Sequence, residues 1–359
     1  MPYANLLMHG AQSALCKLLI FRPMSAKLWR IIIFVSFFQY PPLIAIFVKK
    51  AMGRRKYYKD IINHCYHRAG DSGVIFYTVS DYLVWFTIVC TKARKYKVTI
   101  LAMCPMPDHV HLSVVTSQKK TLSAFMSEYA HDFAVEHNVA CCRKGDFFQH
   151  PFGSVPKVGA KKARSNIIYI ANNPVERQLV EKAEEYRWTF LTYAESDHPF
   201  SEKLVRDKAS QSLRRVLDEV DGLRNADRPL NYAMLKRFFK KLDRRESLQL
   251  TDYIISKYNV IDYDAALSFF DGNYRAMLTA IHSTTGSEYD LNEPFVGKSD
   301  AYYNQMTGII LRECGVKDIH AILSYDMDRK YELFLLLRRL TRAPSEQIGK
   351  YLHMPIKKL

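Results

Sequence analysis

The order of strand-type and helix-type patterns between Ile61 and Pro174 constrains the fold of this chain more than any other feature. Alternating apolar and polar residues indicate a strand, and apolar residues spaced three and four apart indicate a helix. The patterns predict strand, helix, strand, strand, helix, strand and helix over residues 62–70, 76–96, 97–107, 108–117, 121–138, 147–159 and 161–174, respectively. We expect Thr121 to cap the second helix and Pro174 to end the third. This order predicts an α+β fold of the ferredoxin-like, or split βαβ, type.

The residues after Phe200 have a helical pattern instead, in segments 201–223, 232–258 and 325–343. We therefore expect an α+β domain over residues 52–200 and a helical region over residues 201–359. At its end, a helix followed by a short positioning helix at Ser345–Leu352 resembles the start of a helix-turn-helix, truncated at Leu359. An ordinary helical cap is the alternative.

Residues 1–51 form an apolar and basic extension that contains no acidic residue. The apolar run from Leu28 to Val48 is long enough to cross a bilayer. Arg30 lies inside it, however, and Pro41-Pro42 interrupts it. A membrane anchor, an apolar strap packed on the protein and an extension from a misassigned start codon are three interpretations. The polar sequence that begins at Met52 favours the third, so we do not expect a membrane partner.

The charge balance favours a polyanionic partner. The chain has 52 Lys and Arg against 36 Asp and Glu, which gives a net charge of +16. Nucleic acid and an anionic membrane surface are both compatible with this excess, and nucleic acid is the better fit. Seven scattered cysteines without a C-x-x-C motif argue against a disulfide framework and indicate a reducing, cytoplasmic setting.

The predicted third strand carries two histidines, His109 and His111, in the sequence DHVHL. Residues two apart in a strand project from the same face, so both imidazoles can reach one metal ion. An isolated H-x-H pair is more often two half-exposed histidines on a sheet surface.

The last predicted helix of the α+β domain carries Tyr169 and Asn173, which lie one turn apart on one helix face. On its own this pair has an ordinary explanation. Tyr169 would be a core aromatic residue, and Asn173 would end the helix before Pro174.

Taken together, these segments resemble the single-tyrosine HUH transposases, which include the REP-associated tyrosine transposases and their insertion-sequence relatives. The family pattern has an N-H-x-x-x-R strand, an F-x-x-x-x-D-Y helix, an M-P-[DN]-H-V-H-L strand, a Y-I-x-x-N-P-V helix and a W-x-F segment. Here the matching residues are Asn63-His64 with Arg68, Phe76 with Asp81-Tyr82, 106–112, 169–175, and Arg187-Trp188 with Phe190. The resemblance covers roughly a third of the chain, from Asn63 to Ala194.

The resemblance implies roles for the matching residues. Tyr169 is expected to attack a DNA phosphodiester and form a 5′-phosphotyrosine link. His109 and His111 are expected to be ligands of a divalent ion, with Asn173 as the third. Mixed nitrogen and oxygen ligands beside a phosphate suit Mg²⁺ or Mn²⁺. The expected partner is single-stranded or hairpin DNA, and a homodimer is expected because relatives exchange the tyrosine helix.

The chain departs from the family pattern before the tyrosine helix, where His150-Pro151-Phe152 replaces the usual Arg-Phe pair. A group of basic residues could still contact DNA phosphates. It comprises Arg68, Lys157, Lys161, Lys162 and Arg164. A solvated helix start is the alternative explanation for those that follow residue 156.

Two functions from different classes fit these features. One is a transposase that cleaves and rejoins DNA. The other is a catalytically idle relative that only grips hairpin DNA, for example as a repressor. The presence of His109, His111, Tyr169 and Asn173 favours the enzyme. A metal hydrolase without a covalent intermediate is a weaker third possibility.

Overall fold

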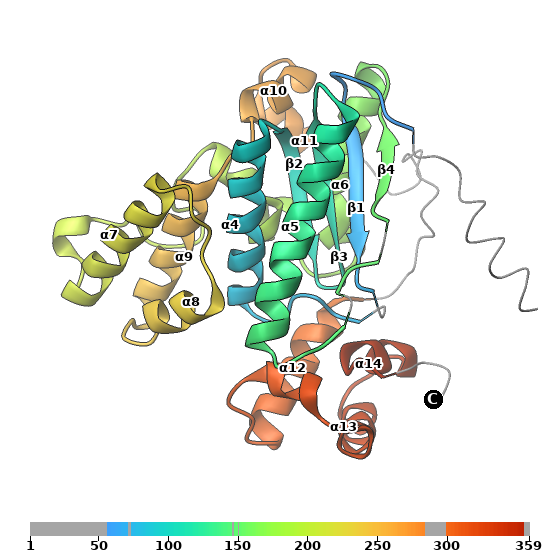
Figure 1. The fold of residues 1–359 in the computed structure, drawn as a ribbon, viewed down its shortest axis with the longest axis vertical. Coiled ribbons are helices and arrows are strands. Elements are labelled where there is room, and N and C mark those ends of the chain that lie inside the picture. Colours follow the sequence, from blue (N-terminus) through green and yellow to red (C-terminus); the bar gives the residue numbers. More distant parts are fainter. Residues whose placement is uncertain (1–55, 71–72, 146, 150, 284–298, 355–359) are drawn as a thin grey trace, which may run out of the picture. The chain divides into compact units, whose positions relative to one another are not determined.

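The computed structural model describes residues 56–359, apart from 71–72, 146, 150, 284–298 and 355–359. Contacts divide the chain into residues 1–54 and residues 55–359. The expected extension over residues 1–51 lies outside the described residues. In the part that is described, the elements comprise one four-stranded sheet with helices on both faces (Figure 1).

The sheet is antiparallel throughout, with the strand order β2-β3-β1-β4. Its strands are β1 (Asn63–Arg68), β2 (Thr99–Met106), β3 (His109–Val115) and β4 (Gly153–Pro156). β1 and β2 run in the same direction with β3 between them, which is the split βαβ arrangement. The predicted α+β, ferredoxin-like fold is therefore confirmed.

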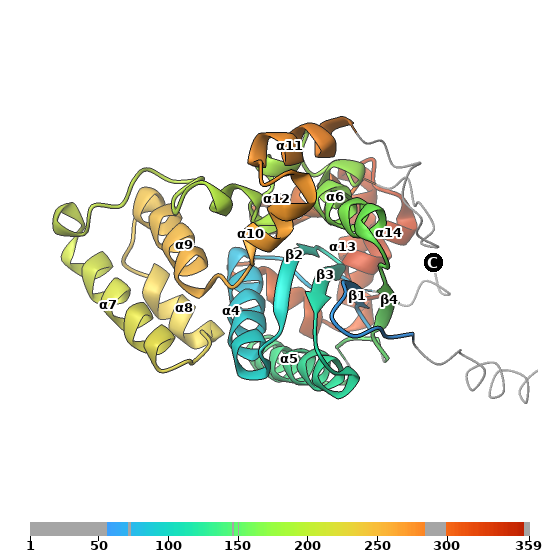
Figure 2. The ribbon, with the colours of Figure 1, turned by 90° about the horizontal axis from the view of Figure 1, so that it is seen from above.

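Two helices, α4 (Val79–Tyr96) and α5 (Lys119–Ala140), cover one face of the sheet, and α6 (Ala160–Glu176) covers the other (Figure 2). A capping box begins α4 at Thr78. The Thr78 side chain accepts a hydrogen bond from the Asp81 backbone N–H, and the Asp81 carboxylate accepts one from the Thr78 backbone N–H. α5 begins at Lys119, two residues before the predicted Thr121 cap. The N-cap residue is Gln118, whose side chain makes no capping hydrogen bond.

α6 also differs from its prediction, because it continues through Pro174 and ends at Glu176. A proline in the last turn removes only its own backbone bond, and the chain behind it closes the helix. The Arg177 N–H donates to the Asn173 carbonyl at 3.0 Å, and the Leu179 N–H donates to the Pro174 carbonyl at 2.9 Å.

The hydrophobic core on the α4 side runs through the expected boundary at residue 200. Three helices after that residue contribute to it: α7 (Gln211–Asn225), α8 (Tyr232–Phe239) and α9 (Arg244–Tyr258). Polar contacts join the same parts, since the buried Asp252 carboxylate accepts from Tyr193 Oη at 2.6 Å and pairs with Arg187. Residues 211–258 therefore pack as part of the same body as the sheet.

The remaining helices pack in two places. α10 (Tyr263–Leu267) and α11 (Tyr274–Ser283) lie on the α6 side of the sheet. α12 (Ala301–Glu313), α13 (Met327–Leu340) and α14 (Ser345–Tyr351) form a separate cluster with Val74.

Tyr77 Oη donates to the Tyr351 carbonyl at 2.6 Å, which ties this cluster to the loop after β1. α14 coincides with the predicted positioning helix, whereas the start of a recognition helix at 355–359 lies outside the described residues. None of the helices in the described ranges is long and apolar enough to cross a membrane.

Candidate active site

Side chains from β1, β3 and α6 meet on the sheet face that α6 covers. The register pairs Arg68 with His109 and Tyr66 with His111, so alternate residues of the two strands point to this face. α6 adds Tyr169, whose ring centroid lies 5.3 Å from that of His111 and 5.6 Å from that of His64. The structure thus brings His109, His111 and Tyr169 together within one chain.

The two histidines of β3 lie side by side, with ring centroids 4.7 Å apart. Each ring is held through Nδ1. His109 Nδ1 contacts the Asp108 carboxylate at 2.5 Å, and His111 Nδ1 contacts His64 Nε2 at 2.9 Å. A ring held in this way presents its Nε2 atom to a ligand. His111 Nε2 is buried and has no hydrogen-bond partner among the described residues, as expected of an atom that binds something else.

Tyr169 is 7% exposed and packs against Cys104 and Met106 of β2. Its hydroxyl-bearing ring therefore stands between an apolar strand and the histidine pair.

Burial and charge fix the protonation of the neighbouring groups. Burial, reinforced by His109 and Arg68, lowers the pKa of His111 well below its usual value, so its imidazole is neutral near pH 7. Burial alone would raise the pKa of the Asp108 carboxyl, but His109 and Lys350 outweigh it and hold that pKa well below its usual value. A neutral histidine and an ionised carboxylate are the forms that a metal site requires.

Asn173 is buried beside the tyrosine, where its Nδ2 donates to the Tyr169 carbonyl at 2.9 Å. Its Oδ1 atom is the one that remains for a ligand. Arg68 lines a pocket of about 220 Å³ next to His109.

The other basic residues lie just before α6 and on its first turns. Lys161, Lys162 and Arg164 are exposed on the first turns of α6, whereas Lys157 is only 6% exposed. The Arg164 guanidinium lies over the Phe270 ring at 4.9 Å.

The 220 Å³ pocket is also lined by residues that no sequence motif indicated. These are Gln149, Arg177, Asp300, Tyr303, Glu346, Gln347 and Lys350. Lys350 of α14 forms an ion pair with Asp108, and Arg177 pairs with Asp300 at 3.4 Å. Burial, followed by the charge of Asp108, raises the pKa of Asp300 to about 7. The C-terminal helices therefore form part of the pocket around His109.

His64 was also missed as a site residue, although the Asn63-His64 motif contains it. The alternation of side chains along the strand could have indicated His64. It lies two residues before Tyr66, on the face that meets His111. No local signal exists for Lys350, since its partner lies 242 residues away in the chain.

Residues 75–173 match the protein family described as "Transposase IS200 like". This range includes His109, His111 and Tyr169. A solved structure described as "Structure of the REP associates tyrosine transposase bound to a REP hairpin" is 20% identical, with a TM-score of 0.34, and the match covers 38% of this chain and 81% of that chain. No curated protein matches the chain. The match of residues 75–173 to this family confirms the resemblance seen in the motifs.

Proposed function

We propose that this chain cleaves and rejoins single-stranded or hairpin DNA, with Tyr169 as the nucleophile, in DNA transposition. The observation that carries the proposal is the meeting of the Tyr169 ring with His111, 5.3 Å between centroids, inside the family-matched segment. A phenol has a pKa of about 10 in water and is a poor nucleophile at pH 7 unless a metal or base assists it. The histidine pair beside Tyr169 is suited to provide that assistance.

His109 and His111 would hold a divalent ion through Nε2, and the Asn173 amide oxygen would be the third protein ligand. The unpartnered Nε2 of His111 supports this arrangement. It requires the His111 tautomer in which Nδ1–H donates to His64 Nε2, because the lone pair then resides on His111 Nε2. Mg²⁺ or Mn²⁺ would polarise the phosphate oxygens as a Lewis acid.

The cleavage step exchanges one phosphodiester bond for another. A bond forms between Tyr169 Oη and phosphorus, the bond from phosphorus to the 3′ oxygen breaks, and the phenolic proton passes to the departing 3′ oxygen. The products are a 5′-phosphotyrosine link and a free 3′-hydroxyl. Because the link preserves the bond energy, attack by another 3′-hydroxyl rejoins DNA without ATP.

DNA would approach along the exposed start of α6. Lys161 lies eight residues before Tyr169, which is about 12 Å along a helix. A cation at that distance would contact a phosphate near the cleaved one. Arg68, beside His109, would contact the phosphate closer to the metal.

Trapping of a covalent adduct tests the proposal. The full chain would be incubated with Mg²⁺ or Mn²⁺ and labelled hairpin oligonucleotides, then denatured. An adduct that disappears in Tyr169→Phe but persists in Tyr66→Phe is the expected result. DNA binding without any adduct would instead favour the hairpin-binding repressor. Product formation without an adduct would favour a metal hydrolase.

We also propose a homodimer as the acting assembly, which light scattering of the purified chain would test. Tyr169 and the histidines meet within one chain, so a cleavage-competent monomer would contradict the need for a partner.

A further inference from the structure

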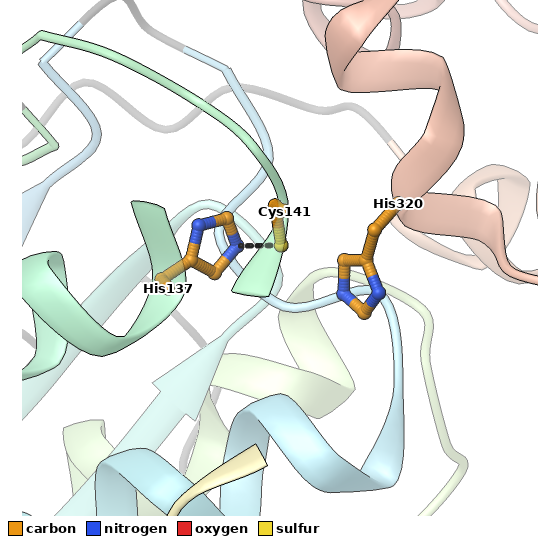
Figure 3. Close-up of side chains that lie close together, drawn as sticks. All are labelled: His137, Cys141 and His320. Carbon is orange, nitrogen blue, oxygen red and sulfur yellow. Dashed lines mark hydrogen bonds between the residues drawn. The ribbon is translucent and has the colours of Figure 1, made fainter. Parts of the chain in front are cut away.

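A second group of metal-ligating side chains lies apart from the tyrosine site. It is located where the start of α4 and the end of α5 meet the C-terminal helices. His137 and Cys141 come from the end of α5, and His320 comes from the 3₁₀ helix η7 (Ile319–Ser324). Figure 3 shows the two imidazole rings on either side of the Cys141 sulfur. One potential ligand atom from each residue lies within 4.8 Å of the other two.

From this arrangement we propose that His137, Cys141 and His320 bind a structural zinc ion. Two imidazoles and a thiolate are donors that zinc accepts in tetrahedral geometry. The three residues are 1%, 5% and 8% exposed, respectively. A site this deeply buried, without access to solvent, fits a structural rather than a catalytic ion.

The spacing of the α5 residues already matches zinc. His137 and Cys141 are four residues apart, so they lie on one helix face, and His137 Nε2 is 3.7 Å from Cys141 Sγ. Bonds of about 2.3 Å to sulfur and about 2.05 Å to nitrogen place the two atoms about 3.6 Å apart in a tetrahedron.

The surroundings of His320 resemble those of a metal-bound histidine. Its Nδ1 contacts the Asp318 carboxylate at 2.8 Å, which orients the ring and directs Nε2 inward. Nε2 lies 2.9 Å from Asp81 Oδ1. This carboxylate is itself held in place, because Oδ2 accepts from the Tyr77 and Thr78 backbone N–H groups.

The protonation states of the three ligands determine which protons zinc binding would release. Burial lowers the pKa of His137 to about 3, so His137 is already neutral. Burial raises the pKa of the Cys141 thiol. Burial alone would lower the pKa of His320, but Asp81 and Asp318 outweigh it and raise that pKa to about 10. Zinc binding near pH 7 therefore releases one proton from Cys141 and one from His320, and affinity increases with pH.

Such an ion would connect the transposase domain to the C-terminal helices. His137 and Cys141 belong to the family-matched segment, whereas His320 belongs to the cluster that carries α14. A zinc ion at this position would hold α14, and with it Lys350, against the pocket beside His109.

The zinc content of the purified full chain tests the proposal. After loading with zinc alone and dialysis against a weak chelator, we expect one retained ion per chain by mass spectrometry. Cys141→Ser should lose it. Cys142→Ser is the matched control, because Cys142 is adjacent and exposed. A wild-type chain without zinc, or a Cys141→Ser chain with undiminished zinc, would overturn the proposal.

Two further measurements guard against misfolding and against confusion with the tyrosine site. Cobalt added to the wild-type chain should give a thiolate-to-cobalt charge-transfer band, and absence of that band would also overturn the proposal. The double variant His109→Ala/His111→Ala should retain its zinc. Loss of zinc in that variant, with the fold intact by circular dichroism, would assign the ion to the tyrosine site.

Discussion

Lys350 forms an ion pair with the same Asp108 carboxylate that holds His109 Nδ1 at 2.5 Å. A residue of the C-terminal helices therefore sits one contact away from an expected metal ligand. The pair joins α14 to the turn between β2 and β3, and both residues line the 220 Å³ pocket. The orientation of the His109 ring thus depends on the docking of α14.

Replacement of Lys350 by Met should reduce Mn²⁺ affinity and strand cleavage by about 10- to 100-fold, the usual effect of losing a group that orients a metal ligand. The aliphatic stem is kept, so the packing changes little. Lys350→Arg should recover most of the activity, and Lys317→Met, on the exposed surface of the same region, should have no effect. Equal Mn²⁺ affinities for wild type and Lys350→Met in calorimetric titrations would contradict this prediction.

His64→Ala should lower metal affinity at His111 by a similar factor, about 10- to 100-fold, because His111 Nδ1 loses the partner that fixes its tautomer. His64→Gln, which can still accept a hydrogen bond, should be less affected. The control is His131→Gln, an exposed histidine on α5. Metal titration followed by cleavage assays at saturating Mn²⁺ distinguishes a positioning role of His64 from a direct role in cleavage. If His64 only positions His111, excess metal should restore much of the cleavage rate.

The fold and the centre of the site were accessible from the sequence because their signals are local. Alternation in DHVHL placed His109 and His111 on one face, and helical spacing placed Tyr169 beside Asn173. Pro174 gave a misleading end to α6 because a proline in the last turn removes only one bond. Lys350 and His320 could not be assigned, since they reach Asp108 and Asp81 from 242 and 239 residues away. Tertiary packing alone creates such pairs.

Replacement of Lys161 and Lys162 by Gln should weaken DNA binding and flatten its salt dependence. For single strands, the slope of log K against log salt should fall by about 0.7 for each lost phosphate contact. The loss should be similar for different DNA sequences, because phosphate contacts carry no base information. Lys240→Gln/Lys241→Gln, exposed residues beyond α8, is the charge-matched control. An unchanged slope would show that DNA avoids the start of α6.

The metal-free chain should lose stability as pH rises above 6.5, because of the Asp81–His320 pair. His320 has a usual pKa of 6.5 and a folded pKa of about 10, so its contribution is complete below pH 6.5 and is lost toward pH 10. Asp81 has a usual pKa of 3.8 and a folded pKa of about 2, so its contribution is complete above about pH 4 and is lost toward pH 2. The pair stabilises the fold most between these limits.

Urea unfolding of chelator-treated wild type and His320→Gln at pH 6 and pH 9 measures this effect. The difference in unfolding free energy between the two proteins should shrink with rising pH, by up to about 1.4 kcal/mol per pH unit for one proton. His137 favours folding less as pH falls below 6.5, because it is buried neutral, but both proteins contain it and its effect largely cancels. Zinc should reverse the trend, since His320 must be deprotonated to bind it. A difference that stays constant from pH 6 to pH 9 without zinc would show that His320 is not charged in the folded chain.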